Sequence, residues 1–227
     1  MGARAVTFLS SFNRIEKWLR EQLNNPGNMG FAQIVRHLSK RSDLSVKKYE
    51  NDLLQISQLR NAIVHEQIGD DFIIAEPNQW VLDQIQLIEH ELLQPERVLP
   101  HFAKKVTGFE QDISLKELLK IIADKRYSQF PLYKKGEFQG LLTLRGIGYW
   151  LAKESLTGQI DLTHKTAKEL ILKDGKKTNY AFVSGQTTIN EVEEMFRKDA
   201  LLDAILITKK GNENGNLLGI IRPRDIF

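Results

Sequence analysis

Three residues of one short segment, Arg60, Asn61 and His65, have side chains that suit proton transfer beside a phosphate group. Cleavage of a phosphate ester is helped by a proton acceptor and by a cation beside the phosphate. An unperturbed imidazole titrates at about pH 6.5, so His65 is suited to take or give the proton. Arg60 would hold the phosphate, and Asn61 would orient the histidine or the substrate. These are our candidate catalytic residues, and the chemistry they predict needs no metal.

The apolar spacing around this motif predicts a helix from Leu44 to Gln67. On a helix, five residues span about 7.5 Å and about 140° of rotation, so Arg60 and His65 do not share one narrow face. Asn61 and His65 lie one turn apart, and a cleft between two helices suits the group. A plainer interpretation stays open, in which Arg60 and His65 are surface or interface groups at a helix end, where positive charge is favourable.

The same spacing predicts three more helices before residue 97, which together make a four-helix bundle. They cover about Phe8 to Leu23, Phe31 to Leu38, and a segment that begins at Pro77 and turns Trp80 inward with its aliphatic neighbours. Phe72–Ala75 is predicted to be extended. We expect Trp80, like the other two tryptophans, to pack in a core.

This helical region, over about residues 5–93, resembles the HEPN superfamily through its R-N-x-x-x-H motif, Arg60, Asn61 and His65. The resemblance implies a homodimer in which two such helices face each other and form one cleft for RNA. It also implies a metal-independent ribonuclease whose products end in 2′,3′-cyclic phosphates.

Beyond residue 100, short strands alternate with helices, and the same arrangement occurs twice. Each copy begins with a capping box that opens a helix and ends with a glycine-led strand. The capping boxes are Ser114–Glu117 and Thr188–Glu191, and the strands are 130–134 with 140–143 in the first copy and 204–208 with 219–221 in the second.

This repeat resembles a pair of cystathionine-β-synthase (CBS) domains, a Bateman module, over about residues 104–160 and 161–227. In that family a closing G-h-h-[ST]-x-x-D motif binds the phosphate and ribose of adenosine-containing nucleotides. The first copy keeps the hydroxyl in Thr143 but has Gly146 in place of the aspartate, whereas the second keeps Asp225 but has Arg222 in place of the hydroxyl. Arginine still pairs well with phosphate.

The resemblance therefore implies a ligand site in which the second copy, with Arg222 and Asp225, is the better candidate. The backbone of Val183, Ser184 and Gly185 is expected to neighbour the adenine, and AMP, ADP or ATP is the expected regulatory ligand.

Composition excludes several classes of protein. Residues 1–97 hold 11 Lys and Arg against 13 Asp and Glu, and residues 98–227 hold 21 Lys and Arg against 16 Asp and Glu. Neither half therefore has the positive charge of a dedicated nucleic-acid domain. The absence of cysteine excludes disulfides and thiolate metal sites, and the histidines show no paired metal spacing. No apolar run is long enough for a membrane span or a secretory signal, so we expect a cytoplasmic protein with no membrane partner.

The two prolines of residues 95–100 predict the connection between a helical domain, 1–97, and a tandem α/β domain, 98–227. The sequence predicts an α plus α/β protein: a HEPN-like four-helix bundle fused to a CBS pair. Its predicted function is that of a nucleotide-responsive, metal-independent ribonuclease or toxin-like RNA-processing factor that forms a homodimer. The alternative is a non-catalytic adenine-nucleotide sensor, a regulatory dimer that acts through a partner.

Overall fold

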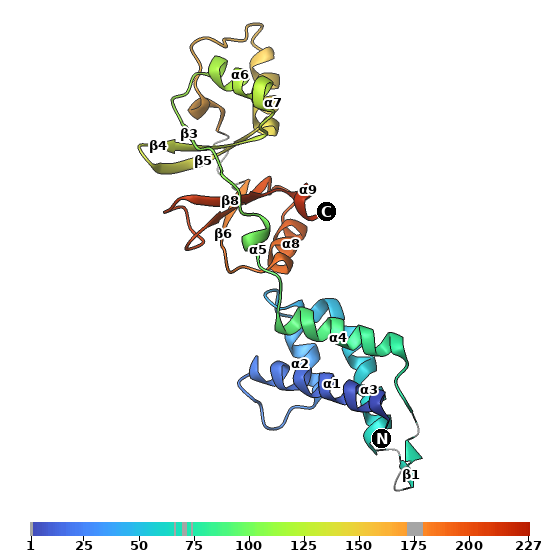
Figure 1. Cartoon of the computed structure of the whole chain (residues 1–227). Helices are drawn as coiled ribbons and strands as arrows, with labels where there is room; N and C mark the ends of the chain where they lie inside the picture. Colours follow the sequence, from blue (N-terminus) through green and yellow to red (C-terminus); the bar gives the residue numbers. More distant parts are fainter. Residues whose placement is uncertain (1, 66, 70–71, 74, 172–178) are drawn as a thin grey trace. The chain divides into compact units, whose positions relative to one another are not determined.

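A computed structural model describes residues 2–65, 67–69, 72–73, 75–171 and 179–227. The chain divides into two compact units, one formed by Met1–Glu96 with Thr188–Glu194 and the other by Arg97–Thr187 with Met195–Phe227. The first unit carries the N-terminal helices and the second carries two small sheets (Figure 1). No helix in these described ranges has the length and hydropathy needed to cross a membrane.

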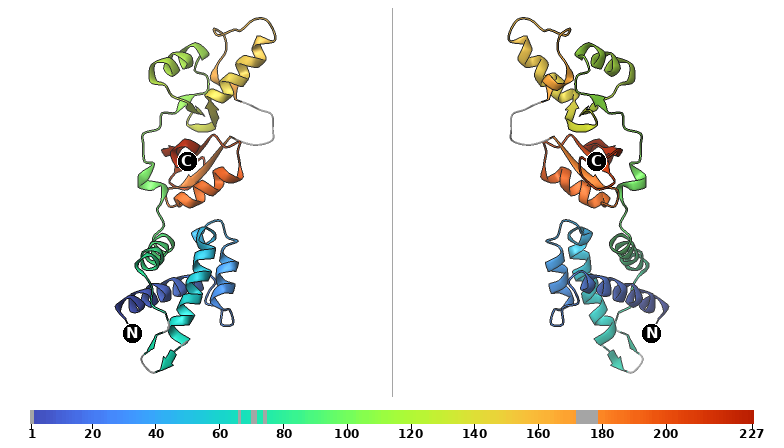
Figure 2. Two further views of the ribbon diagram at one scale, coloured as in Figure 1. Left: turned by 90° about the vertical axis from the view of Figure 1, so that its right-hand side faces the viewer. Right: turned by 90° about the vertical axis from the view of Figure 1, so that its left-hand side faces the viewer.

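The N-terminal region is helical. Its elements are α1 (Ala3–Glu21), α2 (Phe31–Leu38), the 3-10 helix η1 (Ser45–Tyr49), α3 (Glu50–His65) and α4 (Gln79–Leu93). A short antiparallel hairpin, β1 (Gln67–Gly69) with β2 (Phe72–Ile73), follows the C-terminal end of α3, as both views in Figure 2 show.

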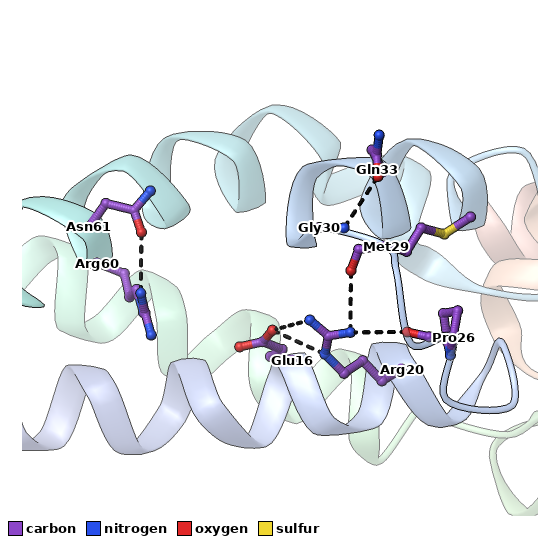
Figure 3. Close-up of polar contacts among 8 residues, drawn as sticks. All are labelled: Glu16, Arg20, Pro26, Met29, Gly30, Gln33, Arg60 and Asn61. Atoms are coloured by element: carbon purple, nitrogen blue, oxygen red, sulfur yellow. Dashed lines mark hydrogen bonds and ion pairs between the residues drawn. The ribbon is translucent and has the colours of Figure 1, made fainter. Parts of the chain in front are cut away.

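Apolar side chains from all of these helices form one core, which explains why the helices pack together. Phe8, Ile15, Leu53 and Ile85 are among its fully buried members. At the surface the Arg14 guanidinium pairs with Glu89 and ties α1 to α4. Near the end of α1, the Arg20 guanidinium binds Glu16 and the main-chain oxygen of Met29, as Figure 3 shows, and so holds the loop before α2.

Three details differ from the sequence predictions. The predicted helix 44–67 begins with a turn of 3-10 helix and ends at His65, and Gln67 belongs to a strand. The fourth helix begins later than Pro77, because the Asn78 side chain caps it by accepting a hydrogen bond from Val81 N at 2.9 Å. The prediction that Trp80 is buried is wrong: its side chain is 68% exposed.

The second unit contains one three-stranded arrangement twice. Each sheet joins a parallel pair to an antiparallel hairpin, in the orders β3-β4-β5 and β6-β7-β8. The strands are β3 (Phe109–Glu110), β4 (Gln129–Lys134), β5 (Glu137–Thr143), β6 (Tyr180–Ser184), β7 (Ala204–Thr208) and β8 (Leu217–Ile221).

Helices α6 and α7 lie beside the first sheet (Figures 1 and 2). The helical elements are α5 (Val98–His101), α6 (Leu115–Lys125), α7 (Leu144–Ser155), η2 (Ala167–Leu170), α8 (Ile189–Lys198) and α9 (Pro223–Ile226). Ser114 caps α6 by accepting from Glu117 N, and the predicted capping box of Thr188 and Glu191 is complete.

An aromatic and aliphatic cluster joins the two copies. The Phe138 ring of β5 lies edge-on to the rings of Tyr180 and Phe182 in β6, with centroids 5.1 Å apart in each case. Leu141 of β5 belongs to the same core cluster as Leu206 of β7. The repeats therefore share part of one core, which places the residues of the closing motifs in a common framework.

Candidate ligand site

The closing motif of the second copy lies where β8 ends and the short helix α9 begins. Arg222 is the residue before α9, and Pro223 fills the first helical position, where its missing N–H costs nothing. The Asp225 carboxylate accepts hydrogen bonds from Arg222 N at 2.9 Å, Nε at 2.8 Å and Nη2 at 2.6 Å. The two candidate ligand residues are thus brought together and bind each other.

The electrostatics of this pair favour full ionisation. Burial raises the pKa of Asp225, but the hydrogen bonds from the Arg222 side chain and backbone outweigh it, so the pKa lies below its ordinary value of 3.8. The pKa of Arg222 is raised by its hydrogen bond to Asp225. Both groups are charged at neutral pH.

A third charged group, Lys104, belongs to the same surface, although sequence reasoning did not select it. Lys104 N donates to the main-chain oxygen of Leu218 at 3.1 Å, and Ala103 bridges to Gly219, so this segment lies along β8. Burial lowers the pKa of Lys104, and its interactions with Arg222 and Arg224 lower the pKa further, against the opposing effect of Asp225. We call Lys104, Arg222, Arg224 and Asp225 the second-copy charge cluster. It holds three cations and one carboxylate.

The backbone expected to neighbour an adenine is contacted by another segment of the chain. The Ser184 hydroxyl accepts from Gln186 N at 3.2 Å and lies 3.4 Å from the Thr187 hydroxyl. A Cβ atom at Gly185 would lie 2.5 Å from Leu99 Cδ1, so the Leu99 side chain packs directly on this glycine. Val183 is buried in β6.

The closing motif of the first copy has different contacts. Thr143, 4% exposed, caps α7 by accepting from Gly146 N at 3.2 Å. Its hydroxyl donates to Asp203 Oδ2 at 3.2 Å, and Arg145 Nη2 lies 3.1 Å from Asp203 Oδ1. Thr143 is therefore joined to Asp203 of the second copy, whereas Arg222 and Asp225 pair with each other.

The candidate catalytic residues lie in the last turns of α3. Arg60 Nη1 donates to Asn61 Oδ1 at 3.3 Å, as Figure 3 shows, and the guanidinium carbon lies 5.8 Å from the centre of the Phe12 ring. His65 is the last residue of α3, but its side chain lies outside the part of the chain that the structure describes. Within that part, no group of three His, Asp or Glu residues is arranged to hold a metal ion.

Comparison with known proteins identifies the repeat. The family model of the CBS domain matches twice, at residues 103–152 and 176–227. The two matched segments are a tandem pair of CBS domains. The family model does not match the helical region. None of the curated proteins compared with the whole chain matches the chain.

Solved CBS structures resemble the chain over about half of its length. A CBS domain-containing protein from Kribbella flavida is 16% identical, covers 55% of this chain and 90% of its own, and has a TM-score of 0.41. The protein ATU1752 from Agrobacterium tumefaciens is 14% identical, covers 54% and 86%, and has a TM-score of 0.42. The CBS pair of MJ0100, in complex with 5′-methylthioadenosine and S-adenosyl-L-methionine, is 18% identical, covers 58% and 93%, and has a TM-score of 0.45.

Within the CBS pair, two residues near the closing motifs had no distinctive sequence signal. Lys104 approaches Arg222 because of a main-chain bridge to β8, and Asp203 approaches Thr143 because β7 and β5 share a core. Both are single charged residues outside any motif, so only the fold brings them to these positions.

Proposed function

We propose that this protein is a regulatory sensor whose CBS pair binds an adenosine-containing ligand, with AMP, ADP or ATP as the expected ligands. CBS pairs commonly bind such ligands. The observation that carries the proposal is the second-copy charge cluster, in which Arg222 is hydrogen-bonded to Asp225 and the charges of Arg222, Arg224 and Asp225 all act on Lys104. Excess positive charge of this kind favours a phosphate group.

Arg222 and Asp225 have complementary roles in this proposal. The guanidinium pairs with the ligand phosphate, and the carboxylate accepts hydrogen bonds from the ribose hydroxyls. The bidentate contact between them orients both groups before a ligand arrives. Binding then exchanges this contact for contacts with the ligand, while Lys104 supplies further positive charge.

Titration calorimetry of the full chain with AMP, ADP, ATP and S-adenosyl-L-methionine tests the proposal. We expect one of these ligands to bind and Arg222→Ala to weaken its binding at least tenfold. The matched control is Arg36→Ala, which removes an exposed arginine of α2 in the other unit. A folded protein that binds none of these ligands, or an Arg222→Ala variant that binds as well as wild type, contradicts the proposal.

We further propose that the sensor is a homodimer and passes its signal to a partner. Exposed apolar residues on and after α7 support the dimer: Leu144 and Leu151 stand seven positions apart on one helix face, and Leu156 follows the helix. Such a face is suited to helix-to-helix packing between two copies.

A second candidate function, metal-independent RNA cleavage by a HEPN-like helical bundle, is favoured by one specific observation. The Arg60 guanidinium is oriented by both Asn61 and the Phe12 ring, so a phosphate-binding cation is held within two turns of His65. In this proposal the nucleotide bound by the CBS pair regulates a cleft formed by two copies of α3.

Incubation of the full chain with mixed RNA in EDTA, with and without AMP, tests this second function. It predicts products with 2′,3′-cyclic phosphate ends, lost in His65→Ala and retained in His37→Ala, which changes an exposed histidine of α2. Intact RNA after incubation with folded wild type under both conditions removes the ribonuclease and leaves the sensor.

A further inference from the structure

The carboxylate of Asp203, in the second CBS copy, binds Thr143 and Arg145 of the first copy as well as Asn179. Asp203 precedes β7, and its side chain is only 16% exposed. Oδ2 accepts from the Thr143 hydroxyl at 3.2 Å and from Asn179 Nδ2 at 2.9 Å, while Oδ1 pairs with Arg145 at 3.1 Å. Asp203 N also donates to the main-chain oxygen of Asn179 at 2.7 Å, which fixes the backbone that carries the carboxylate.

The groups that hold Asp203 are those that would hold a phosphate. Thr143 supplies a buried hydroxyl, Arg145 a guanidinium, and the 12-residue helix α7 the positive end of its dipole. Asn179 adds an amide donor. In this structure the Thr143 hydroxyl, the Arg145 guanidinium and the Asn179 amide are directed at an anion that belongs to the chain itself.

We propose that Asp203 is a tethered anion that closes the first CBS copy to phosphate-bearing ligands, so that each chain binds one such ligand, at the second copy. This inference rests on the proposed ligand-binding function. A phosphate at Thr143 would stand beside the carboxylate and would be repelled by it, or would have to displace it from Thr143, Asn179 and Arg145.

The net charge beside the closing motif differs between the two copies because of Asp203. In the first copy, Arg145 is matched by Asp203, so the pair brings no excess charge. In the second-copy charge cluster, Asp225 is bonded to Arg222, and Lys104 and Arg224 add further positive charge, which leaves an excess of positive charge. The repeat of the fold is therefore not a repeat of the site, and Asp203 determines the difference.

The test is the stoichiometry of AMP binding to the full chain, measured by calorimetry with wild type, Asp203→Asn and Asp203→Ala. Asp203→Asn removes the negative charge but keeps an oxygen that accepts the hydrogen bond from Thr143. If Asp203→Ala does not fold, the AMP stoichiometry of Asp203→Asn alone tests the inference. Asp124→Ala, which removes an exposed carboxylate at the end of α6, is the matched control. We expect one AMP per chain in wild type and control, and two in the Asp203 variants.

The added site has its own check. Arg145→Ala combined with Asp203→Asn should return the stoichiometry to one, because the cation of the opened site is then missing.

The alternative outcomes separate this inference from the proposed function. Two AMP molecules per wild-type chain, or one AMP per chain in wild type and in the folded Asp203 variants alike, overturns the inference and leaves the proposed function standing. No binding by wild type together with one AMP per Asp203 variant supports closure of the first copy by Asp203 but overturns the proposed site at the second copy. No binding by any folded protein overturns both.

Discussion

At the scale of single residues, each closing motif has its polar groups bound within the chain. Arg222 and Asp225 form a bidentate pair, and the Thr143 hydroxyl is shared between Gly146 N and Asp203. These contacts satisfy groups that burial would otherwise penalise, and they also determine which charges a ligand meets. Both consequences can be measured on substituted proteins.

The Arg222–Asp225 pair makes stability depend on pH. Because the folded protein lowers the pKa of Asp225 below its ordinary 3.8, the ionised carboxylate stabilises the fold above that value, and this contribution is lost as pH falls through the folded pKa. Urea unfolding should show Asp225→Asn less stable than wild type at pH 7, with a gap that narrows below about pH 4. A gap that is constant between pH 7 and pH 3 would contradict the role of the charge.

Thr143 contributes through its hydroxyl. Thr143→Val keeps the shape but removes the cap of α7 and the bond to Asp203, so we expect a loss of about 1–2 kcal/mol in the free energy of unfolding. Thr143→Ser keeps the hydroxyl and should lose clearly less. Equal losses in the two variants, measured by urea denaturation, would show that the hydroxyl is not the stabilising group.

At the scale of elements, the contact between β8 and the segment before β3 places Lys104 in the second-copy charge cluster. A Cβ at Gly219 would lie 2.2 Å from the main-chain oxygen of Phe102, so glycine is needed where these two backbones meet. Gly219→Ala should therefore destabilise the protein by about 1–3 kcal/mol in urea denaturation.

Gly148 provides the matched control for that substitution. It lies inside α7, and nothing lies within 4 Å of a Cβ placed there. Gly148→Ala should stabilise the protein by about 0.5–1 kcal/mol, since alanine restricts the unfolded chain and favours the helix. If both substitutions change the free energy of unfolding alike, the close approach at Gly219 is not what requires glycine.

The elements also show what the sequence can and cannot predict. Periodicity predicted α2 and β7 with their observed bounds, and the capping residues Ser114 and Thr188 marked the starts of α6 and α8, because these signals are local. Trp80 was predicted to be buried because it stands at helical spacing among aliphatic neighbours, but such spacing alone does not determine exposure, and the side chain is 68% exposed.

The candidate sites depend more strongly on tertiary structure. The sequence paired Arg222 with Asp225 because three residues separate them at a strand-to-helix turn. It gave no signal for Lys104 or Asp203, because Lys104 approaches Arg222, and Asp203 approaches Thr143, across more than 50 positions of the chain. The side chain of His65 lies outside the described residues, so its role as a catalytic base stays a prediction.

At the scale of the whole molecule, the proposed homodimer can be tested on α7. Two acidic substitutions, Leu144→Glu with Leu151→Glu, place charges on the exposed face proposed as the dimer contact. Sedimentation should show wild type as a dimer and the double variant as a folded monomer. Val6→Glu with Leu87→Glu, at exposed apolar positions of the helical region, is the control, and a dimer that survives both pairs rejects this face.

We propose that the CBS pair binds an adenosine-containing ligand through the second-copy charge cluster. The most direct test is calorimetric titration of the full chain with AMP, ADP, ATP and S-adenosyl-L-methionine, for wild type, Arg222→Ala and Arg36→Ala. We expect wild type and Arg36→Ala to bind at least one of these ligands, and Arg222→Ala to bind it at least tenfold more weakly. Folded wild-type protein that binds none of the four, or equal binding by all three proteins, would contradict it.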